Sequence, residues 1–320
     1  MAIELARAQA LAKPWGVADL RPWSKAGPDD GRPVGEIWYE RPPGGAASDA
    51  SLLLKLLFTS QPLSIQVHPD DEYAQSMGLA RGKSEAWYIL SAAPGAKIAL
   101  GLKERLAPRQ LREAVNDGSI VRHVAWRTVL QGDVVLVPAG TIHAIGAGLV
   151  IAEIQQRSDA TFRMFDFGRK RELHVERAVA VADAGPADAG LKPKRLTDER
   201  TLLASNPHFT FERIDLAPGS AFSLEAERET WLLVVKGSAR AGRFDVATGD
   251  AVFAQSDSVD IQAGPVGMTS LVAYTGVDDP IPQRLAEPSA TDAGGPDKMQ
   301  VRTSLPPAKA AAVRGQRTMQ

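Results

Sequence analysis

A short pattern occurs twice in this 320-residue chain and limits the folds that the chain can adopt. The pattern is Gly-Asp followed by four apolar residues, and it begins at Gly132 and again at Gly249. The first copy runs on to His143, whereas the second has Asp260 at that position. Upstream of the two copies stand the tripeptides Glu85-Ala-Trp87 and Glu229-Thr-Trp231. This similarity indicates two related β units, of which the first keeps a possible metal ligand. The alternative is that short Gly-Asp-apolar strands recur by chance.

Short strand-like runs that end near Gly, Pro, Asn or Asp dominate the rest of the sequence. Within residues 51–68, Pro62 divides two such runs, because proline cannot donate to a strand ladder. A helix is expected in PRQLREAVNDG, and a shorter one after Pro69-Asp70-Asp71, whose carboxylates can cap it. The other expected strands are 85–90, 134–137, 149–155, 161–167, 208–216, 230–236 and 250–254. The sequence therefore predicts an all-β sandwich or barrel with small helical insertions.

A change of composition divides the chain into parts. Residues 183–199 are rich in Ala, Gly and Pro and lack periodicity, which is typical of a linker. We therefore expect a first domain over 1–182, which carries the helical insertion, and a second β domain over 200–280. Residues 281–320 have little apolar surface to bury, so a disordered tail is predicted there.

Charge and composition exclude several classes of function. Lys and Arg total 37 against 38 Asp and Glu, so no global field favours nucleic acid or an anionic membrane. The absence of cysteine excludes disulfides, zinc-thiolate sites, iron-sulfur clusters and thiol nucleophiles. No apolar run is long enough to span a membrane, and the first residues lack the features of a secretory signal. A cytoplasmic protein is expected, and its oligomeric state stays open.

Four polar side chains are predicted to meet around a divalent metal ion. In Ser64-Ile-Gln66-Val-His68 the polar residues share one face of a strand, because side chains alternate. Glu85 lies in the next strand, and His143 follows a Pro-x-Gly turn. Two imidazoles, a carboxylate and an amide oxygen suit Zn²⁺ or another divalent first-row metal. The alternative is that the histidines are structural, although these groups would be costly to bury without partners.

The same residues resemble a known family. The segment from Gly132 fits the second cupin signature, G-x5-P-x-G-x2-H, although Ala147 stands where Asn is usual. In the first signature, Gln66-x-His68 replaces His-x-His and Glu85 lies farther downstream. That variation resembles the type I, zinc-dependent mannose-6-phosphate isomerases in their short bacterial form. The other matching blocks are GEIW, SIQVHPDDEYA, RGKSEAWYIL, VPAGTIHAI and EIQQRSDATFRMFDFGR, and the similarity covers about residues 13–180.

The resemblance implies a bicupin, with two β-barrel or jelly-roll units, that interconverts mannose 6-phosphate and fructose 6-phosphate through an enediol. It implies one Zn²⁺ per chain and a small sugar phosphate as the partner. The ligands implied are Gln66, His68, Glu85 and His143.

The resemblance also implies roles for other polar residues. Arg163 matches a catalytic arginine, Arg169 a cation near the phosphate, and Lys83 a polar lysine of the active site. Ser64 and Lys55 match positions associated with phosphate binding. Moving a carbonyl between C1 and C2 needs a base, and Glu153 is a candidate because its apolar neighbours suggest a carboxylate that points into a cavity. Lys55 lies within an apolar run, so it could instead pair with a buried carboxylate.

Two other classes of function stay open at this point. A non-catalytic, sugar-phosphate-binding cupin would keep the metal and the pocket but would not isomerise a hexose 6-phosphate. A cupin dioxygenase would need iron and open coordination positions, and a glutamine ligand is unusual there. The sequence does not settle the identity of the base, the breadth of substrates or the role of the second β unit.

Overall fold

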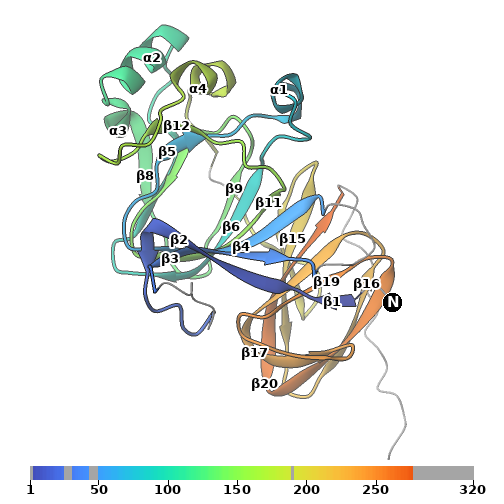
Figure 1. The fold of residues 1–320 in the computed structure, drawn as a ribbon. Coiled ribbons are helices and arrows are strands. Elements are labelled where there is room, and N and C mark those ends of the chain that lie inside the picture. The colour runs from blue at the N-terminus through green and yellow to red at the C-terminus, as the bar shows by residue number, and fades with distance from the viewer. Residues whose placement is uncertain (1–2, 25–30, 43–49, 189–190, 277–320) are drawn as a thin grey trace, which may run out of the picture. The chain divides into compact units, whose positions relative to one another are not determined.

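Strands arranged in three antiparallel sheets form about half of the residues that a computed structural model describes, which are 3–24, 31–42, 50–188 and 191–276 (Figure 1). The predicted all-β class with small helical insertions is confirmed. The predicted tail, 281–320, lies outside the described residues. Among the described residues, no helix is long and apolar enough to cross a membrane.

The first barrel consists of a six-stranded and a five-stranded sheet, both antiparallel. In spatial order the six-stranded sheet contains β2 (Arg7–Val17), β3 (Val34–Glu40), β4 (Leu52–Thr59), β11 (Leu149–Gln156), β6 (Glu85–Ala92) and β9 (Val134–Val137). The five-stranded sheet contains β12 (Phe162–Phe165), β5 (Ile65–Val67), β10 (His143–Ile145), β7 (Lys97–Leu102) and β8 (Val124–Thr128).

Strand β4 explains how the first barrel is built, because it is buried on both faces. Leu54, Leu56 and Phe58 point outward into one apolar core, whereas Leu57 points inward into another. Lys55 shares the inward face with Leu57, since side chains alternate along a strand. A lysine in the middle of this apolar run is therefore placed inside the barrel.

The second barrel is formed by the nine-stranded sheet. Its main path is β1 (Ile3–Leu5), β19 (Ala251–Ala254), β17 (Thr230–Ala241), β20 (Asp257–Thr275), β15 (Phe209–Leu216), β14 (Arg200–Ser205) and β13 (Lys194–Arg195). Off this path, β16 (Ala221–Ala226) pairs with β20, and β18 (Phe244–Ala247) pairs with β17. An apolar core that includes Phe222, Leu232 and Val272 fills this barrel. Strand β1 therefore pairs within a barrel whose other strands all lie after residue 193 in the sequence.

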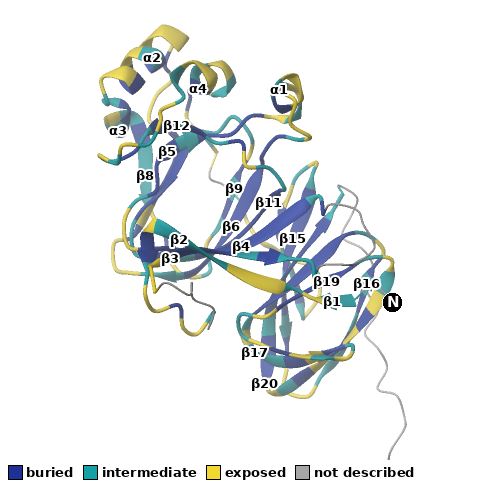
Figure 2. Cartoon of the chain, viewed as in Figure 1, coloured by how far each residue is buried: buried dark blue, intermediate teal, exposed yellow. Residues whose placement is uncertain are grey.

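The two barrels share an apolar core. Side chains on the outer faces of β4 and β6 belong to the same cluster as Phe211, Trp231 and Phe253 of the second barrel, and Figure 2 shows these strands as largely buried. Polar contacts reinforce this junction: the Tyr39 hydroxyl donates to the Gly249 carbonyl at 2.7 Å. The Glu229 carboxylate accepts from the backbone amides of residues 51 and 52.

The repeated Gly-Asp pattern forms the same turn in both barrels. Gly132 and Gly249 both have positive φ, which favours glycine, and each leads into a strand, β9 or β19. The predicted alignment of the two Glu-x-Trp tripeptides is wrong: in the structure, the second tripeptide is shifted by one residue relative to the first. Trp87 is the cross-strand partner of Val135, but Trp231 is the partner of Phe253, the counterpart of Leu136. A shift of one residue turns a side chain to the other face, so Trp231 points out of its barrel.

Four short helices gather at one end of the first barrel (Figure 1): α1 (Asp71–Ser76), α2 (Pro108–Asn116), α3 (Ile120–His123) and α4 (Val175–Val181). The helices expected near residues 71 and 108 are confirmed, and Asp70 caps α1 by accepting from the Tyr73 amide. The sequence did not indicate α4, whose Val-rich segment packs against β12 and α2.

Residues 183–188 follow α4 and hydrogen-bond to the first barrel, where Ala184 accepts from Leu106 and Gly185 from Leu102. Strand β13 already belongs to the second barrel. The domain division over 1–182, 183–199 and 200–280 stays a prediction.

Candidate active site and metal centre

Two rows of side chains surround a cavity of about 420 Å³ inside the first barrel, and all of them except His143 line it. Within each sheet they are direct cross-strand partners, which point to the same face. The row on the six-stranded sheet is Trp38, Lys55, Glu153 and Trp87. The row on the five-stranded sheet is Arg163, Gln66 and His143. The strand register therefore brings most of the predicted site residues together, although they are far apart in the sequence.

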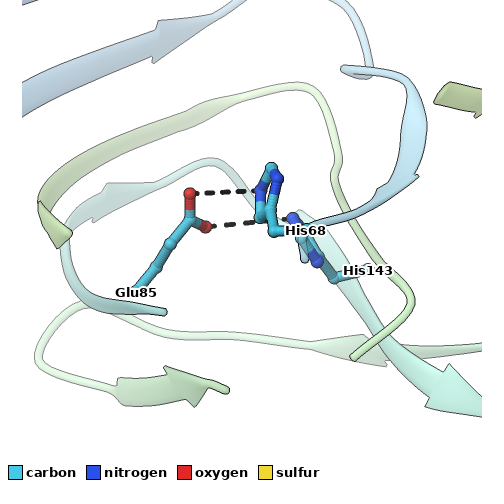
Figure 3. A group of neighbouring side chains, drawn as sticks. All are labelled: His68, Glu85 and His143. Carbon is cyan, nitrogen blue, oxygen red and sulfur yellow. Dashed lines mark ion pairs between the residues drawn. The ribbon is translucent and has the colours of Figure 1, made fainter. Parts of the chain in front are cut away.

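A buried group that could hold a metal ion lies beside this cavity. One ligand atom from each of His68, Glu85 and His143 lies within 4.8 Å of the others, and all three residues are 1% exposed. Figure 3 shows the Glu85 carboxylate facing both imidazoles. Its oxygens lie 3.3 Å from Nε2 of His68 and 3.8 Å from Nε2 of His143.

The hydrogen bonds of this group fit a metal ion. Nδ1 of His68 lies 2.8 Å from the Ala160 carbonyl, and Nδ1 of His143 lies 2.8 Å from the Thr141 carbonyl. A carbonyl can only accept, so both Nδ1 atoms are protonated and both Nε2 atoms present lone pairs to the centre. In the described structure, Nε2 of His68 and Oε2 of Glu85 are buried without hydrogen-bond partners. Such orphaned atoms are costly unless a ligand satisfies them.

Gln66 lies at the same centre. Its side-chain Nε2 lies 3.2 Å from Nε2 of His143, and its Oε1 accepts from the Ser64 hydroxyl at 3.0 Å. A half-turn of the amide exchanges its oxygen and nitrogen, and the Ser64 hydroxyl can then accept from the amide nitrogen. The site can therefore offer two imidazole nitrogens, a carboxylate and an amide oxygen.

Burial and nearby charges set the protonation states of the group. Burial, followed by the Lys83 charge, lowers the pKa of His68 to about 3, so this imidazole is neutral. Burial likewise lowers the pKa of His143. Burial opposes ionisation of Glu85, but the charge of Lys83, at 2.8 Å, outweighs it and holds the pKa of that carboxyl well below its usual range. The three groups are in the states that metal binding requires.

Glu153 occupies the centre of the opposite row. Its Oε2 accepts from the Trp87 indole at 2.9 Å, and its Oε1 lies 3.6 Å from Nζ of Lys55. Burial, followed by the negative charge of Glu85, raises the pKa of Glu153 to about 7. Lys55 also donates to Gln155 at 2.6 Å and lies over the Trp38 ring. Lys55 is thus engaged by several groups on the cavity wall.

The cations of the five-stranded side differ in their contacts. Within the described residues, the Arg163 guanidinium has no hydrogen bond or ion pair, and it lines the cavity with Ser64. Arg169 does not line the cavity: it bonds to Asp166 and to the Pro62 carbonyl. Arg171 also pairs with Asp166, yet it reaches the cavity.

Sequence reasoning did not assign several other residues that line the cavity. They are Lys13, Trp15, Glu36, Trp38, Asp159, Thr161, Arg171 and His174. The family block GEIW contains Glu36 and Trp38, and the block EIQQRSDATFRMFDFGR contains Asp159 and Thr161. Nothing in the local sequence marks Lys13, whose ammonium lies 3.2 Å from Glu36 across two paired strands.

Comparisons with known proteins agree with this architecture. No family model matches the chain. A mannose-6-phosphate isomerase of Streptococcus mutans is 36% identical over 233 residues, which is 69% of this chain and 72% of that protein. A probable mannose-6-phosphate isomerase of Bacillus subtilis, GmuF, is 35% identical over 49% of this chain and 53% of its own length.

The fold is also that of a solved structure. The crystal structure of the mannose 6-phosphate isomerase of Bacillus subtilis superposes with a TM-score of 0.75. The match covers 86% of this chain and all of that one, at 24% sequence identity. By its sequence similarity to the Streptococcus mutans protein over most of both chains, this chain belongs to the family of mannose-6-phosphate isomerases.

Proposed function

We infer that this chain is an aldose-ketose isomerase that interconverts mannose 6-phosphate and fructose 6-phosphate with the help of one bound Zn²⁺. The observation that carries this inference is the group of orphaned ligand atoms on His68 and Glu85, which lies beside a cavity rich in charged side chains. Family membership supports the reaction. The proposed ligands are Gln66, His68, Glu85 and His143. A cytoplasmic location stays a prediction of the sequence.

The charges of the cavity suit a sugar phosphate. Five cationic side chains, Lys13, Lys55, Lys83, Arg163 and Arg171, line the cavity with four acidic ones, Glu36, Glu85, Glu153 and Asp159. With a divalent cation the site is net positive, which favours a dianionic phosphate group. When bound, Zn²⁺ would supply Lewis-acid stabilisation of negative charge on a sugar oxygen.

Glu153 is proposed to move the proton between C2 and C1. A group whose pKa lies near 7 can both accept and return a proton at neutral pH. The Trp87 indole fixes one carboxylate oxygen, which leaves the other toward Lys55. Lys83, buried against Glu85, is proposed as a further polar residue at the reacting end.

Arg163 is proposed to stabilise the enediolate. Its guanidinium lines the cavity without an ionic partner in the described structure, so its charge is available to a ligand. Charge that develops in the transition state is best stabilised by such a fixed donor. Ser64, Lys55 and Arg169 remain the proposed phosphate contacts, although Arg171, not Arg169, reaches the cavity wall.

A coupled assay of mannose 6-phosphate turnover tests this function. We expect turnover with mannose 6-phosphate, little with mannose 1-phosphate or glucose 6-phosphate, loss on chelation and recovery with Zn²⁺. Activity retained by protein shown to be metal-free would contradict the role of zinc. No turnover of any hexose 6-phosphate by zinc-loaded protein would favour a binding cupin, and stoichiometric iron with oxygen uptake would favour a dioxygenase.

Substitution of Arg163 tests its separate role. Arg163→Ala is expected to lower kcat by about 100-fold or more, since one fixed donor to a developing oxyanion contributes that much in other enzymes. Zinc content, measured by mass spectrometry, should stay near one per chain because Arg163 is not a proposed ligand. A near-normal kcat in this variant would show that the arginine has been assigned the wrong role.

A further inference from the structure

Arg163 lies on a strand that has a neighbour on one side only. Among the described residues, strand β12 is the edge of the five-stranded sheet and pairs only with β5, and the register between them shifts after Arg163. An edge residue whose amide and carbonyl point away from the sheet has no strand to bind. In this position the backbone of a proposed catalytic residue needs another partner.

His174 provides that partner. Its Nδ1 accepts from the Arg163 amide at 3.1 Å, and its own amide donates to the Arg163 carbonyl at 2.8 Å. One residue, eleven positions later in the chain, thus makes both hydrogen bonds that a neighbouring strand would make. We propose that His174 is a positioning residue that holds Arg163 in place through Nδ1; this inference rests on the function proposed for Arg163.

The hydrogen bond fixes the tautomer of His174. A backbone amide can only donate, so Nδ1 must carry the lone pair. The ring is then neutral with its proton on Nε2. This is the reverse of the tautomer assigned above to His68 and His143, whose Nδ1 atoms donate to carbonyls. His174 is therefore set up to hold a strand and not to bind a metal through Nε2.

Several contacts hold His174 against the helical end of the first barrel. The residue immediately precedes α4, and its carbonyl accepts from the Ala178 amide in the first turn of that helix. Helix α4 packs against β12 and α2, and Glu176 pairs with Arg112 of α2. The His174 ring lies 6.1 Å from the Phe162 ring. The position of Arg163 is thereby coupled to the helical end of the barrel.

His174 also lines the cavity, so an alternative hypothesis is that its Nε2–H contacts the substrate directly. Two substitutions distinguish the role of Nδ1 from that of Nε2. In His174→Asn, the side-chain oxygen can occupy the place of Nδ1, but no group replaces Nε2. In His174→Gln, the amide reaches the place of Nε2, but no acceptor remains near the Arg163 amide. His174→Ala removes both groups.

Kinetics provide the first measurement. H174A is expected to lower kcat about 10- to 100-fold with a smaller change in KM, as for other supporting residues. H174N should recover most of this loss, and H174Q should not. In the R163A background, H174A should cause little further loss. Recovery by H174Q alone, or fully additive losses with R163A, would overturn the proposal.

Amide hydrogen exchange at Arg163 provides a measurement that needs no activity. Exchange is expected to accelerate in H174A and H174Q and to stay slow in H174N, with zinc content and melting temperature compared across the set. Ring nitrogen NMR of wild-type protein should show the neutral Nε2–H tautomer. If zinc-loaded wild type were inactive, the proposed isomerase would fail, while these data would still test the hydrogen bond. Equal exchange in all variants, or an Nδ1–H tautomer, would overturn the proposal.

Discussion

The first barrel surrounds a cavity lined by charged groups, whereas the second barrel is filled by apolar side chains, although the same Gly-Asp turn begins a strand in each. With the turns aligned, Trp87 corresponds to Leu232 and Glu85 to Thr230. In the first barrel the inward positions carry the proposed ligand Glu85 and the indole that holds Glu153. In the second barrel Leu232 packs in the apolar core, and Thr230 is a buried, uncharged side chain.

Buried charge is also handled differently in the two barrels. Arg200 and Glu212 form a buried ion pair in the second barrel, in which Glu212 accepts from Arg200 at both oxygens and from the Tyr274 hydroxyl. In the first barrel, Glu85 and His68 keep buried atoms without hydrogen-bond partners. An ion pair whose polar atoms all have hydrogen-bond partners has no free donor or acceptor for a ligand, whereas a group with unpartnered atoms does. Between these two groups, the unsatisfied atoms of Glu85 and His68, and not burial of charge alone, distinguish the proposed metal site.

Loss of a proposed ligand is expected to have the largest effect. His143→Ala removes one imidazole from the metal group, so metal content should fall well below one per chain. Turnover should fall by more than the ~100-fold typical of supporting residues. The matched change in the second barrel is Asp260→Ala. Asp260 is exposed on β20, so stability should change by less than ~0.5 kcal/mol and activity should be retained. Normal metal content in H143A would contradict the assignment.

Leu232→Ala tests the filled interior of the second barrel. Leu232 is 2% exposed, and truncation of a buried leucine costs about 2–5 kcal/mol. Denaturant unfolding should show that loss, with kcat per folded molecule unchanged. The corresponding change in the first barrel, Trp87→Phe, removes the donor to Glu153 and should lower turnover more than stability. Equal losses of activity in both variants would show that the barrels are not functionally distinct.

Much of the first barrel and of the candidate site could be predicted from the sequence, because these features depend on local sequence patterns. Alternation placed Gln66 and His68 on one face, turn residues marked the strand ends, and the apolar run around Lys55 indicated that this lysine could pair with a buried carboxylate, as it does with Glu153. The Pro-x-Gly turn before His143 is held because Gly140, at positive φ, donates to the His68 carbonyl.

The remaining features depend on strand register and on contacts between distant residues, which local sequence patterns do not determine. An ungapped comparison matched Trp231 with Trp87, but the backbone places Trp231 one position out of register and on the outer face. Strand β2 and the contact of Lys13 with Glu36 were missed because their pairing is set by the sheet. The segment that forms α4 contains three valines, which favour strands locally, and tertiary packing against β12 makes it helical.

Glu229→Gln tests the junction between the barrels. The carboxylate accepts from the amides of residues 51 and 52 and from the Trp231 indole at 3.0 Å. An amide has one oxygen and a donor group, so buried donors would lose partners, at a cost of about 1–3 kcal/mol. Urea unfolding should show this loss while kcat changes little. Glu227→Gln, at an exposed position two residues earlier, is the control and should change neither quantity. A wild-type stability in E229Q would mean that the Glu229 carboxylate contributes little to the junction.

Asp166→Asn is expected to have the smallest effect, and its pH dependence has a definite sign. Burial opposes ionisation of Asp166, but hydrogen bonds from Arg171 and Arg169 outweigh it and lower the pKa of that carboxyl. A carboxyl with a lowered pKa stabilises the folded state above its unfolded pKa, near 4, and that contribution disappears as pH falls through the folded value. D166N should therefore be less stable than wild type by about 1 kcal/mol at pH 7, with the difference shrinking below pH ~4. Asp245→Asn breaks an exposed contact to Arg240 at 3.8 Å in the second barrel and should change stability by less than ~0.5 kcal/mol. If the difference in stability between D166N and wild type persisted unchanged at low pH, Asp166 would act through packing. The positions of Arg169 and Arg171 would then not depend on its charge.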